Sequence, residues 1–144
     1  INAILKAGYL PTVISMEINE TIPSGIHFSV NFDPNHSWQF DHFYGCSIDA
    51  AYNTVIPYGY MLYKVEYNNA FFIKSSKAIS TWKHLSAAEA YDEGYRKKIN
   101  RKELFPWNSD VDYWQDLSKI KVIEEIKTKF SSYSGKFTVF ELKK

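Results

Sequence analysis

Three stretches of the chain alternate between hydrophobic and polar residues, the pattern of half-buried β-strands. The strongest alternation puts Met61, Tyr63, Val65 and Tyr67 on one face of a strand. A short apolar run follows it directly after the turn signal Asn68-Asn69, which predicts one further strand. The predicted strands cover residues 25–32, 60–67, 70–73 and 136–142.

Helical spacing of apolar residues separates these strands. Ser47 precedes a short helix that is broken at Pro57, and Ser86 with Glu89 forms a capping-box pattern. The predicted helices cover residues 2–7, 48–52, 87–98 and, with interruptions, 110–130. Helices and strands do not alternate regularly, so we predict an α+β fold with a mixed or antiparallel sheet and flanking helices.

Composition narrows the class of protein. The chain has 144 residues, 45% of them hydrophobic and 23% charged, which indicates one folded domain over residues 1–144. The net charge of +1 argues against a nucleic-acid partner. No apolar run approaches the ~20 residues that span a bilayer, so we predict no membrane span. Aromatic residues make up 17% of the chain, which suits a β-rich core and clefts that stack planar ligands.

Cysteine and histidine give no metal-binding pattern. Cys46 is the single cysteine, which excludes an internal disulfide and a cysteine-based zinc site. His36 and His42 lie six residues apart in a loop, and this spacing matches no template for metal ligands. We therefore predict no metal site.

Three segments, in chain order, carry a family resemblance. The first is Ile4 to Pro11, an Ile-containing helix that ends in glycine and a Leu-Pro exit. The second runs from Phe43 to Phe71 and contains Gly45-Cys46-Ser47, a short helix and the strand around Tyr63. The third is Ala87 to Ile99, with the acidic pair Asp92-Glu93. Together they resemble the mono-ADP-ribosyltransferase toxins of the cholera and pertussis toxin type.

The resemblance implies a function and a site. It implies an ADP-ribosyltransferase-like fold that takes NAD as substrate and modifies a protein acceptor. The family's catalytic glutamate corresponds to Glu93, and its orienting hydroxyl to Ser47 or, as second choice, Ser29. Tyrosine faces that stack on nicotinamide are assigned to Tyr44, Tyr63 or Tyr91. The resemblance also implies a partner subunit and a secreted or delivered effector.

The chain departs from the family pattern in three places. The family's first strand holds an arginine or histidine that binds NAD, and this chain starts after that strand. Because Ile1 is not Met, we interpret it as a cut end and expect a fragment or processed form. Gly45-Cys46-Ser47 stands where the family has Ser-Thr-Ser, and Tyr91-Asp92-Glu93 stands where it has a Glu-x-Glu or Gln-x-Glu motif.

Two other functions stay open from the sequence. One is a non-enzymatic interaction module or an inactive relative of the same fold, in which Glu93 pairs with Lys97 on a helix surface and Ser47 is only an N-cap. The other is a small nuclease-like toxin domain, indicated by the histidines and the basic residues Arg96-Lys97-Lys98 and Arg101-Lys102.

Overall fold

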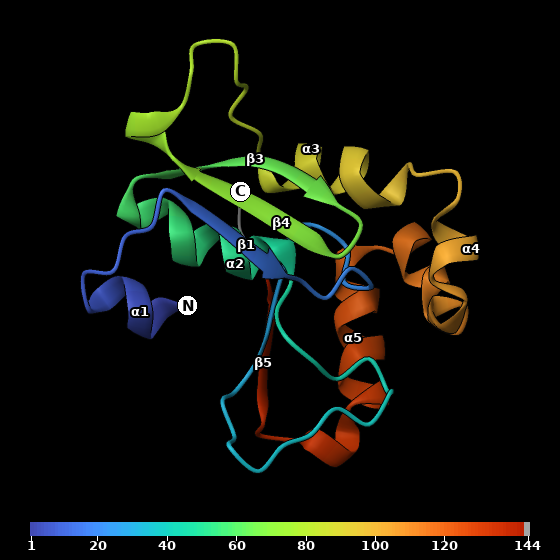
Figure 1. The fold of residues 1–144 in the computed structure, drawn as a ribbon. Coiled ribbons are helices and arrows are strands. Elements are labelled where there is room, and N and C mark those ends of the chain that lie inside the picture. The colour runs from blue at the N-terminus through green and yellow to red at the C-terminus, as the bar shows by residue number, and fades with distance from the viewer. Residues whose placement is uncertain (143–144) are drawn as a thin grey trace.

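The computed structural model describes residues 1–142 and has an α+β architecture with two antiparallel sheets (Figure 1). The larger sheet has the order β1-β4-β3, and the smaller one pairs β2 with β5. The strands are β1 (Val13–Glu17), β2 (Ile26–Val30), β3 (Tyr60–Glu66), β4 (Asn69–Lys74) and β5 (Phe137–Glu141). The α+β class is thus confirmed, with antiparallel pairing throughout the described strands.

Short helices connect the strands and cover the sheets (Figure 1). The α-helices are α1 (Asn2–Lys6), α2 (Ile48–Val55), α3 (Ala87–Tyr91), α4 (Arg101–Leu104) and α5 (Lys119–Lys129). A π-helical turn, η3 (Asp92–Arg96), extends α3. The 3-10 turns are η1 (Ile56–Tyr58), η2 (Ser75–Lys77), η4 (Pro106–Asn108), η5 (Asp112–Asp116) and η6 (Ser131–Tyr133). No helix within residues 1–142 is long and apolar enough to cross a bilayer.

The four predicted strands are confirmed, and a fifth was missed. β1 pairs with β4 in the register Ile14↔Phe72, so it forms an edge of the larger sheet. The predicted hairpin is β3–β4, and its turn falls at Tyr67 and Asn68, one residue earlier than expected. The alternation predicted for β3 is wrong at Tyr63, because a bulge there shifts the register between Leu62 and Lys64.

The predicted helices differ most from the structure near 92 and 110. The predicted helix 87–98 is α-helical only to Tyr91, and the predicted helix 110–130 becomes η5 followed by α5. Gly94 explains the first difference, because a Cβ there would lie 2.2 Å from the Val65 carbonyl oxygen. The backbone of η3 therefore packs directly on β3, and the Gly94 carbonyl accepts a hydrogen bond from Tyr67 N at 2.9 Å.

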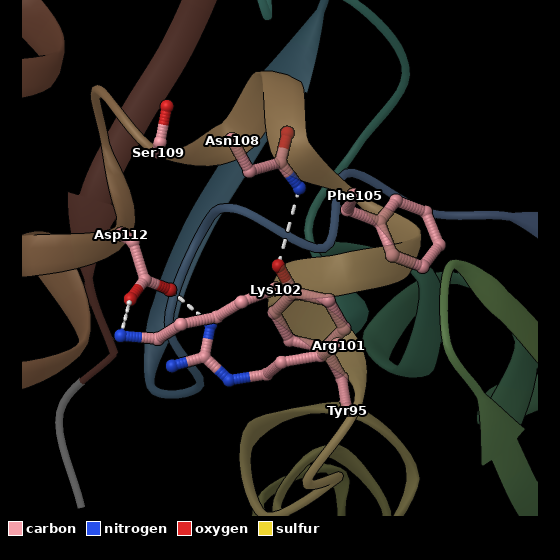
Figure 2. Close-up of a pocket in the computed structure, with 7 residues that line it drawn as sticks. All are labelled: Tyr95, Arg101, Lys102, Phe105, Asn108, Ser109 and Asp112. Carbon is pink, nitrogen blue, oxygen red and sulfur yellow. Dashed lines mark hydrogen bonds and ion pairs between the residues drawn. The ribbon is translucent and has the colours of Figure 1, made fainter.

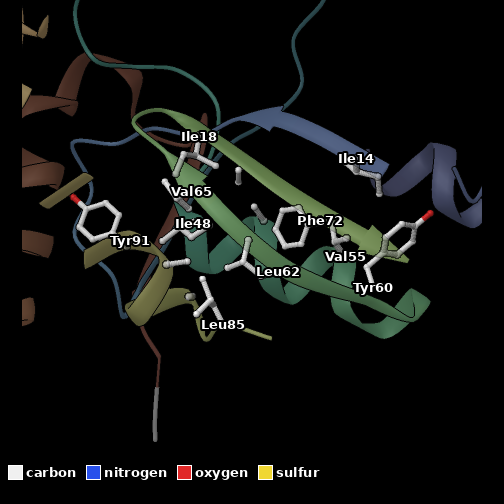
Figure 3. Close-up of a cluster of buried hydrophobic side chains, with 14 of the residues drawn as sticks. Ile14, Ile18, Ile48, Val55, Tyr60, Leu62, Val65, Phe72, Leu85 and Tyr91 are labelled. Carbon is white, nitrogen blue, oxygen red and sulfur yellow. The ribbon is translucent and has the colours of Figure 1, made fainter. Parts of the chain in front are cut away.

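Two hydrophobic clusters form the core. The first lies between the larger sheet, α2 and α3, and includes Leu62, Phe72 and Tyr91 (Figure 3). The second packs β2 and β5 against α5 through Phe28, Ile126 and other side chains. Ser47 fixes the start of α2 against β2, because its hydroxyl accepts from Ala50 N and Phe28 N and donates to Ile26 O.

Candidate functional site

A cleft lined by two carboxylates and several aromatic rings lies where four distant parts of the chain meet. We call it the Glu20 cleft. Its volume is about 210 Å³. Its lining residues are Glu17, Glu20, Trp38, Tyr44, Asn68, Phe105 and Trp107. None of these seven residues is basic, so the cleft combines negative charge with aromatic surface.

Glu20 is the buried acid of this cleft. It follows β1 and is 1% exposed. The Tyr44 hydroxyl donates to Glu20 Oε2 at 2.5 Å, and Asn108 Nδ2 donates to Oε1 at 2.8 Å. Each carboxylate oxygen therefore accepts from one neutral donor, the arrangement that an ionised carboxylate needs when it is removed from water.

Within the part of the chain that the structure describes, Glu20 forms no ion pair. Within residues 1–142, no lysine, arginine or histidine nitrogen lies within 4.0 Å of Glu20. A buried charge without a counterion is costly and is characteristic of functional sites. Burial, and next the negative charge of Glu20, raises the pKa of Tyr44 far above its ordinary value, so Tyr44 stays a hydrogen-bond donor.

Hydrogen bonds from the side chain of Asn19 hold the cleft in shape. Asn19 is fully buried, and its Nδ2 donates to His42 O at 2.8 Å and to Tyr44 O at 3.2 Å. These bonds tie the turn that carries Glu20 to the segment that carries Tyr44. Trp107 of η4 also lines the cleft, and it packs on Phe105, the residue before η4, with ring centroids 5.4 Å apart.

A second hollow of about 240 Å³ shares Trp38, Tyr44 and Trp107 with the Glu20 cleft. Phe40 and His42 complete its lining, and we call it the outer hollow. Trp38 is 45% exposed, Trp107 57% and Phe40 82%, so large aromatic faces remain open to solvent beside a buried acid. Exposed aromatic surface of this kind is characteristic of binding sites.

A smaller hollow of about 120 Å³ lies behind Asn108 (Figure 2). Asn108 Nδ2 also donates to the Tyr95 hydroxyl at 3.1 Å, which links this hollow to Glu20. Arg101 and Lys102 both pair with Asp112 there (Figure 2). Because Asp112 neutralises only one of the two positive charges, this hollow keeps a net charge of +1, in contrast to the acidic Glu20 cleft.

Of the six residues assigned from the sequence, Tyr44 lines the Glu20 cleft and the other five do not. Ser47 is fully buried, and its hydroxyl is already used in three hydrogen bonds, so the N-cap alternative describes it. Ser29 lies on β2 and bridges Cys46 through the backbone. Tyr63 packs on Trp82, and Tyr91 is 1% exposed in the core.

Glu93 lies on the exposed side of η3 and lines neither the Glu20 cleft nor the outer hollow. The alternative pairing with Lys97 is wrong, because Lys97 Nζ lies 3.1 Å from Asp92. The π-helical turn brings residues five apart together, and Lys97 N accordingly donates to Asp92 O at 2.9 Å. We expected the carboxylate of Glu93 to border a cleft for a dinucleotide. It borders neither the Glu20 cleft nor the outer hollow, so the expectation is wrong for both.

The basic residues that indicated a nuclease are paired with acids. Arg96 and Lys97 contact Asp92, and Lys98 lies 2.9 Å from Glu66. Arg101 and Lys102 both contact Asp112. Three carboxylates therefore offset part of the charge of these five cations, which weakens the positive field that a phosphate backbone would meet.

The lone cysteine is a poor nucleophile, and the histidines belong to no metal-binding cluster within residues 1–142. Burial raises the pKa of the Cys46 thiol to about 11, which keeps it protonated and a poor nucleophile at neutral pH. Within residues 1–142 no three His, Cys, Asp or Glu side chains gather in a metal-binding arrangement.

No protein-family model, curated protein or solved structure matches the chain in comparisons of sequence and fold.

Proposed function

We propose that this domain binds a small organic cation with a planar ring in the Glu20 cleft. The observation that carries the proposal is the buried carboxylate of Glu20, which has aromatic walls and, within residues 1–142, no cationic partner. This corresponds to the non-enzymatic binding module that the sequence left open.

Both the aromatic rings and the carboxylates of the Glu20 cleft attract positive charge. The faces of Trp and Tyr rings attract a cation with about 0.5–1 kcal/mol at exposed sites and about 2 kcal/mol when the contact is dry. Glu17 and Glu20 add Coulombic attraction that grows as water leaves the cleft. A neutral ring of the same shape keeps the stacking and loses both electrostatic contributions.

Calorimetry with a matched ligand pair tests the proposal. 1-Methylnicotinamide, called N-methylnicotinamide here, has its methyl group on the ring nitrogen and carries a permanent positive charge. Nicotinamide is its neutral counterpart. We expect the protein to bind the cation at least about tenfold more tightly, equivalent to about 1.4 kcal/mol. The Glu20→Gln variant keeps the shape and an acceptor for Asn108, and should reduce the preference to below about threefold.

Glu93→Gln is the control for this experiment. It removes the same charge from an exposed position outside the cleft, so it should leave both affinities unchanged. Equal binding of the charged and neutral ligands by the wild type would contradict the proposal. So would an equal loss of affinity in Glu20→Gln and Glu93→Gln.

We propose NAD-dependent ADP-ribosyl transfer to a protein acceptor, on an ADP-ribosyltransferase-like fold, as the second candidate function. The nicotinamide ring of NAD is a planar cation, which is the ligand class that the cleft favours. Strand β3 and the turn that follows it also fall within the second of the resembling segments. In this proposal the nitrogen–ribose bond breaks, nicotinamide leaves with the electron pair, and an acceptor side chain attacks the ribose carbon.

A carboxylate beside the ribose would stabilise the developing positive charge. We propose Glu20 for this role in place of Glu93, because Glu20 lies in the cleft. The test is release of nicotinamide from NAD, and transfer of label from NAD to protein in a lysate. Activity that is lost in Glu20→Gln and kept in Glu93→Gln would support this assignment, and the reverse result would restore Glu93. No release by the wild type would leave the binding function alone.

A further inference from the structure

His42 is a nearly buried side chain that the proposed function has not used. It is 6% exposed and lines the outer hollow together with Trp38, Phe40, Tyr44 and Trp107. Its Nε2 lies 2.9 Å from Asp110 Oδ1. The second oxygen of Asp110 accepts from Lys129 Nζ at 2.7 Å, so the carboxylate is held between a histidine and a lysine.

This arrangement determines which nitrogen of the His42 imidazole ring carries the proton. Burial raises the pKa of Asp110, but hydrogen bonds from Lys129 and His42 outweigh burial and hold it below its ordinary value. An ionised carboxylate only accepts hydrogen bonds, so the proton of a neutral His42 sits on Nε2. Nδ1 is then an acceptor, and within residues 1–142 it has no hydrogen-bond partner.

The backbone around His42 is held in an uncommon conformation. Phe40 has a φ of 61° and His42 a φ of 65°, both in the left-handed region that side chains with a Cβ rarely adopt. The hydrogen bond from Asn19 to His42 O secures this conformation. Strain of this kind persists where the surrounding structure enforces it, and it is often found at functional sites.

We propose that Nδ1 of His42 is the hydrogen-bond acceptor that selects the ligand. The inference rests on the proposed function and adds to it the class of ligand. The preferred ligand is a planar cation that carries an N–H or O–H donor on its ring, placed to reach the outer hollow while the charged ring occupies the Glu20 cleft.

An isosteric pair of pyridinium ions tests this inference. N-methylnicotinamide has a carboxamide that donates and accepts, whereas N-methyl-3-acetylpyridinium has a methyl group in place of the amide NH₂ and can only accept. The wild type should bind the carboxamide about 3- to 10-fold more tightly, because one hydrogen bond is lost in the acetyl compound. The His42→Phe variant should bind the two compounds equally.

Asp110→Asn is the second variant, and it moves the proton of the neutral His42 ring from Nε2 to Nδ1. Lys129 donates to the new amide oxygen, so the amide nitrogen faces Nε2 and donates to it. The ring proton then moves to Nδ1, which becomes a donor. The acetyl compound should therefore bind this variant more tightly than it binds the wild type, an effect that a merely structural role of Asp110 would not produce.

The outcomes separate the two proposals. Equal binding of both compounds by the wild type, with the preference for cations intact, would overturn the role of His42 alone. A preference for the carboxamide that survives in His42→Phe would overturn it as well. Absence of binding by either compound would overturn both this inference and the proposed cation site.

Discussion

Two glutamates show how surroundings, and not residue type, decide which acid can have a role. Glu20 is enclosed by Tyr44 and Asn108, whereas Glu93 is exposed on a π-helical turn. A carboxylate in bulk water has a screened field, while one at the floor of an aromatic cleft acts at close range on whatever enters. Chemistry that depends on a fixed negative charge therefore belongs at Glu20.

Removing Glu20 should also weaken the fold. Glu20→Ala leaves the Tyr44 hydroxyl without its acceptor and the Asn108 amide with the Tyr95 hydroxyl alone, and a buried donor without a partner costs about 1–3 kcal/mol. We expect a loss of about 2–4 kcal/mol in the free energy of unfolding, measured by urea denaturation. Glu93→Ala should change it by less than about 0.5 kcal/mol, and a similar loss in both variants would contradict the burial of Glu20.

At the residue scale the sequence predicted local roles better than distant ones. Ser47 as an N-cap follows from the polar residue that precedes an apolar helix, and the structure confirms that alternative. Glu20 gave no signal, because its partners Tyr44 and Asn108 lie 24 and 88 residues away in the sequence. Burial that arises from such distant contacts is not encoded in any local pattern.

At the scale of elements, the strands with an alternating or continuous apolar pattern were predicted, and the short edge strand β1 was not. β2 and β5 fall within their predicted ranges because alternate residues face one core. β1 is five residues long and turns only two apolar residues, Ile14 and Met16, inward, while Val13 is exposed, so its pattern is too short to predict a strand. Its position is set by pairing with β4, more than fifty residues later, which no local pattern shows.

The π-helical turn η3 depends on Gly94. In Gly94→Ala, the new Cβ would meet the Val65 carbonyl carbon and oxygen at 2.6 and 2.2 Å, so η3 and β3 must move apart. We expect a loss of about 3 kcal/mol or more in the free energy of unfolding, measured by chemical denaturation.

Gly59→Ala provides the comparison for Gly94→Ala. Gly59 has a φ of 81°, and a Cβ added there would have nothing within 4 Å, so only backbone strain of about 1 kcal/mol applies. A loss in Gly94→Ala no larger than in Gly59→Ala would show that η3 does not pack directly on β3.

At the scale of the whole molecule, a polar layer joins the two hydrophobic clusters. The Tyr91 hydroxyl from the first cluster lies 2.7 Å from Glu20 O and 3.0 Å from Gln115 Oε1, and Gln115 Nε2 donates to Thr21 O at 3.2 Å. The Glu20 cleft opens at the edge of this layer. The sequence predicted the two sets of apolar residues as one core and gave no indication of the polar layer, because its members come from separate segments.

The ion pairs of Asp112 should make the fold sensitive to acid. Burial raises the pKa of Asp112, but its contacts with Arg101 and Lys102 outweigh burial and hold it below the ordinary value of 3.8. A lowered folded-state pKa contributes stability above the unfolded-state value, and this contribution disappears as pH falls through the folded-state value. The midpoint of thermal unfolding should therefore decrease below about pH 4.

Asp112→Asn isolates this contribution. The variant should be less stable than the wild type by about 1–3 kcal/mol at pH 7, and the difference should shrink as the pH approaches about 2. A difference between variant and wild type that stays constant from about pH 7 to about pH 2 would contradict the role given to the Asp112 carboxylate.

The most direct test of the account is a titration of the four tryptophan indole N–H signals by NMR with N-methylnicotinamide. Trp38 and Trp107 line the Glu20 cleft, whereas Trp82 packs on Tyr63 and Trp114 is buried in the second cluster. The account predicts saturable shifts of the Trp38 and Trp107 signals, steady Trp82 and Trp114 signals, and an affinity at least about threefold weaker in Glu20→Gln. Shifts confined to Trp82 or Trp114, or unchanged binding in Glu20→Gln, would contradict it.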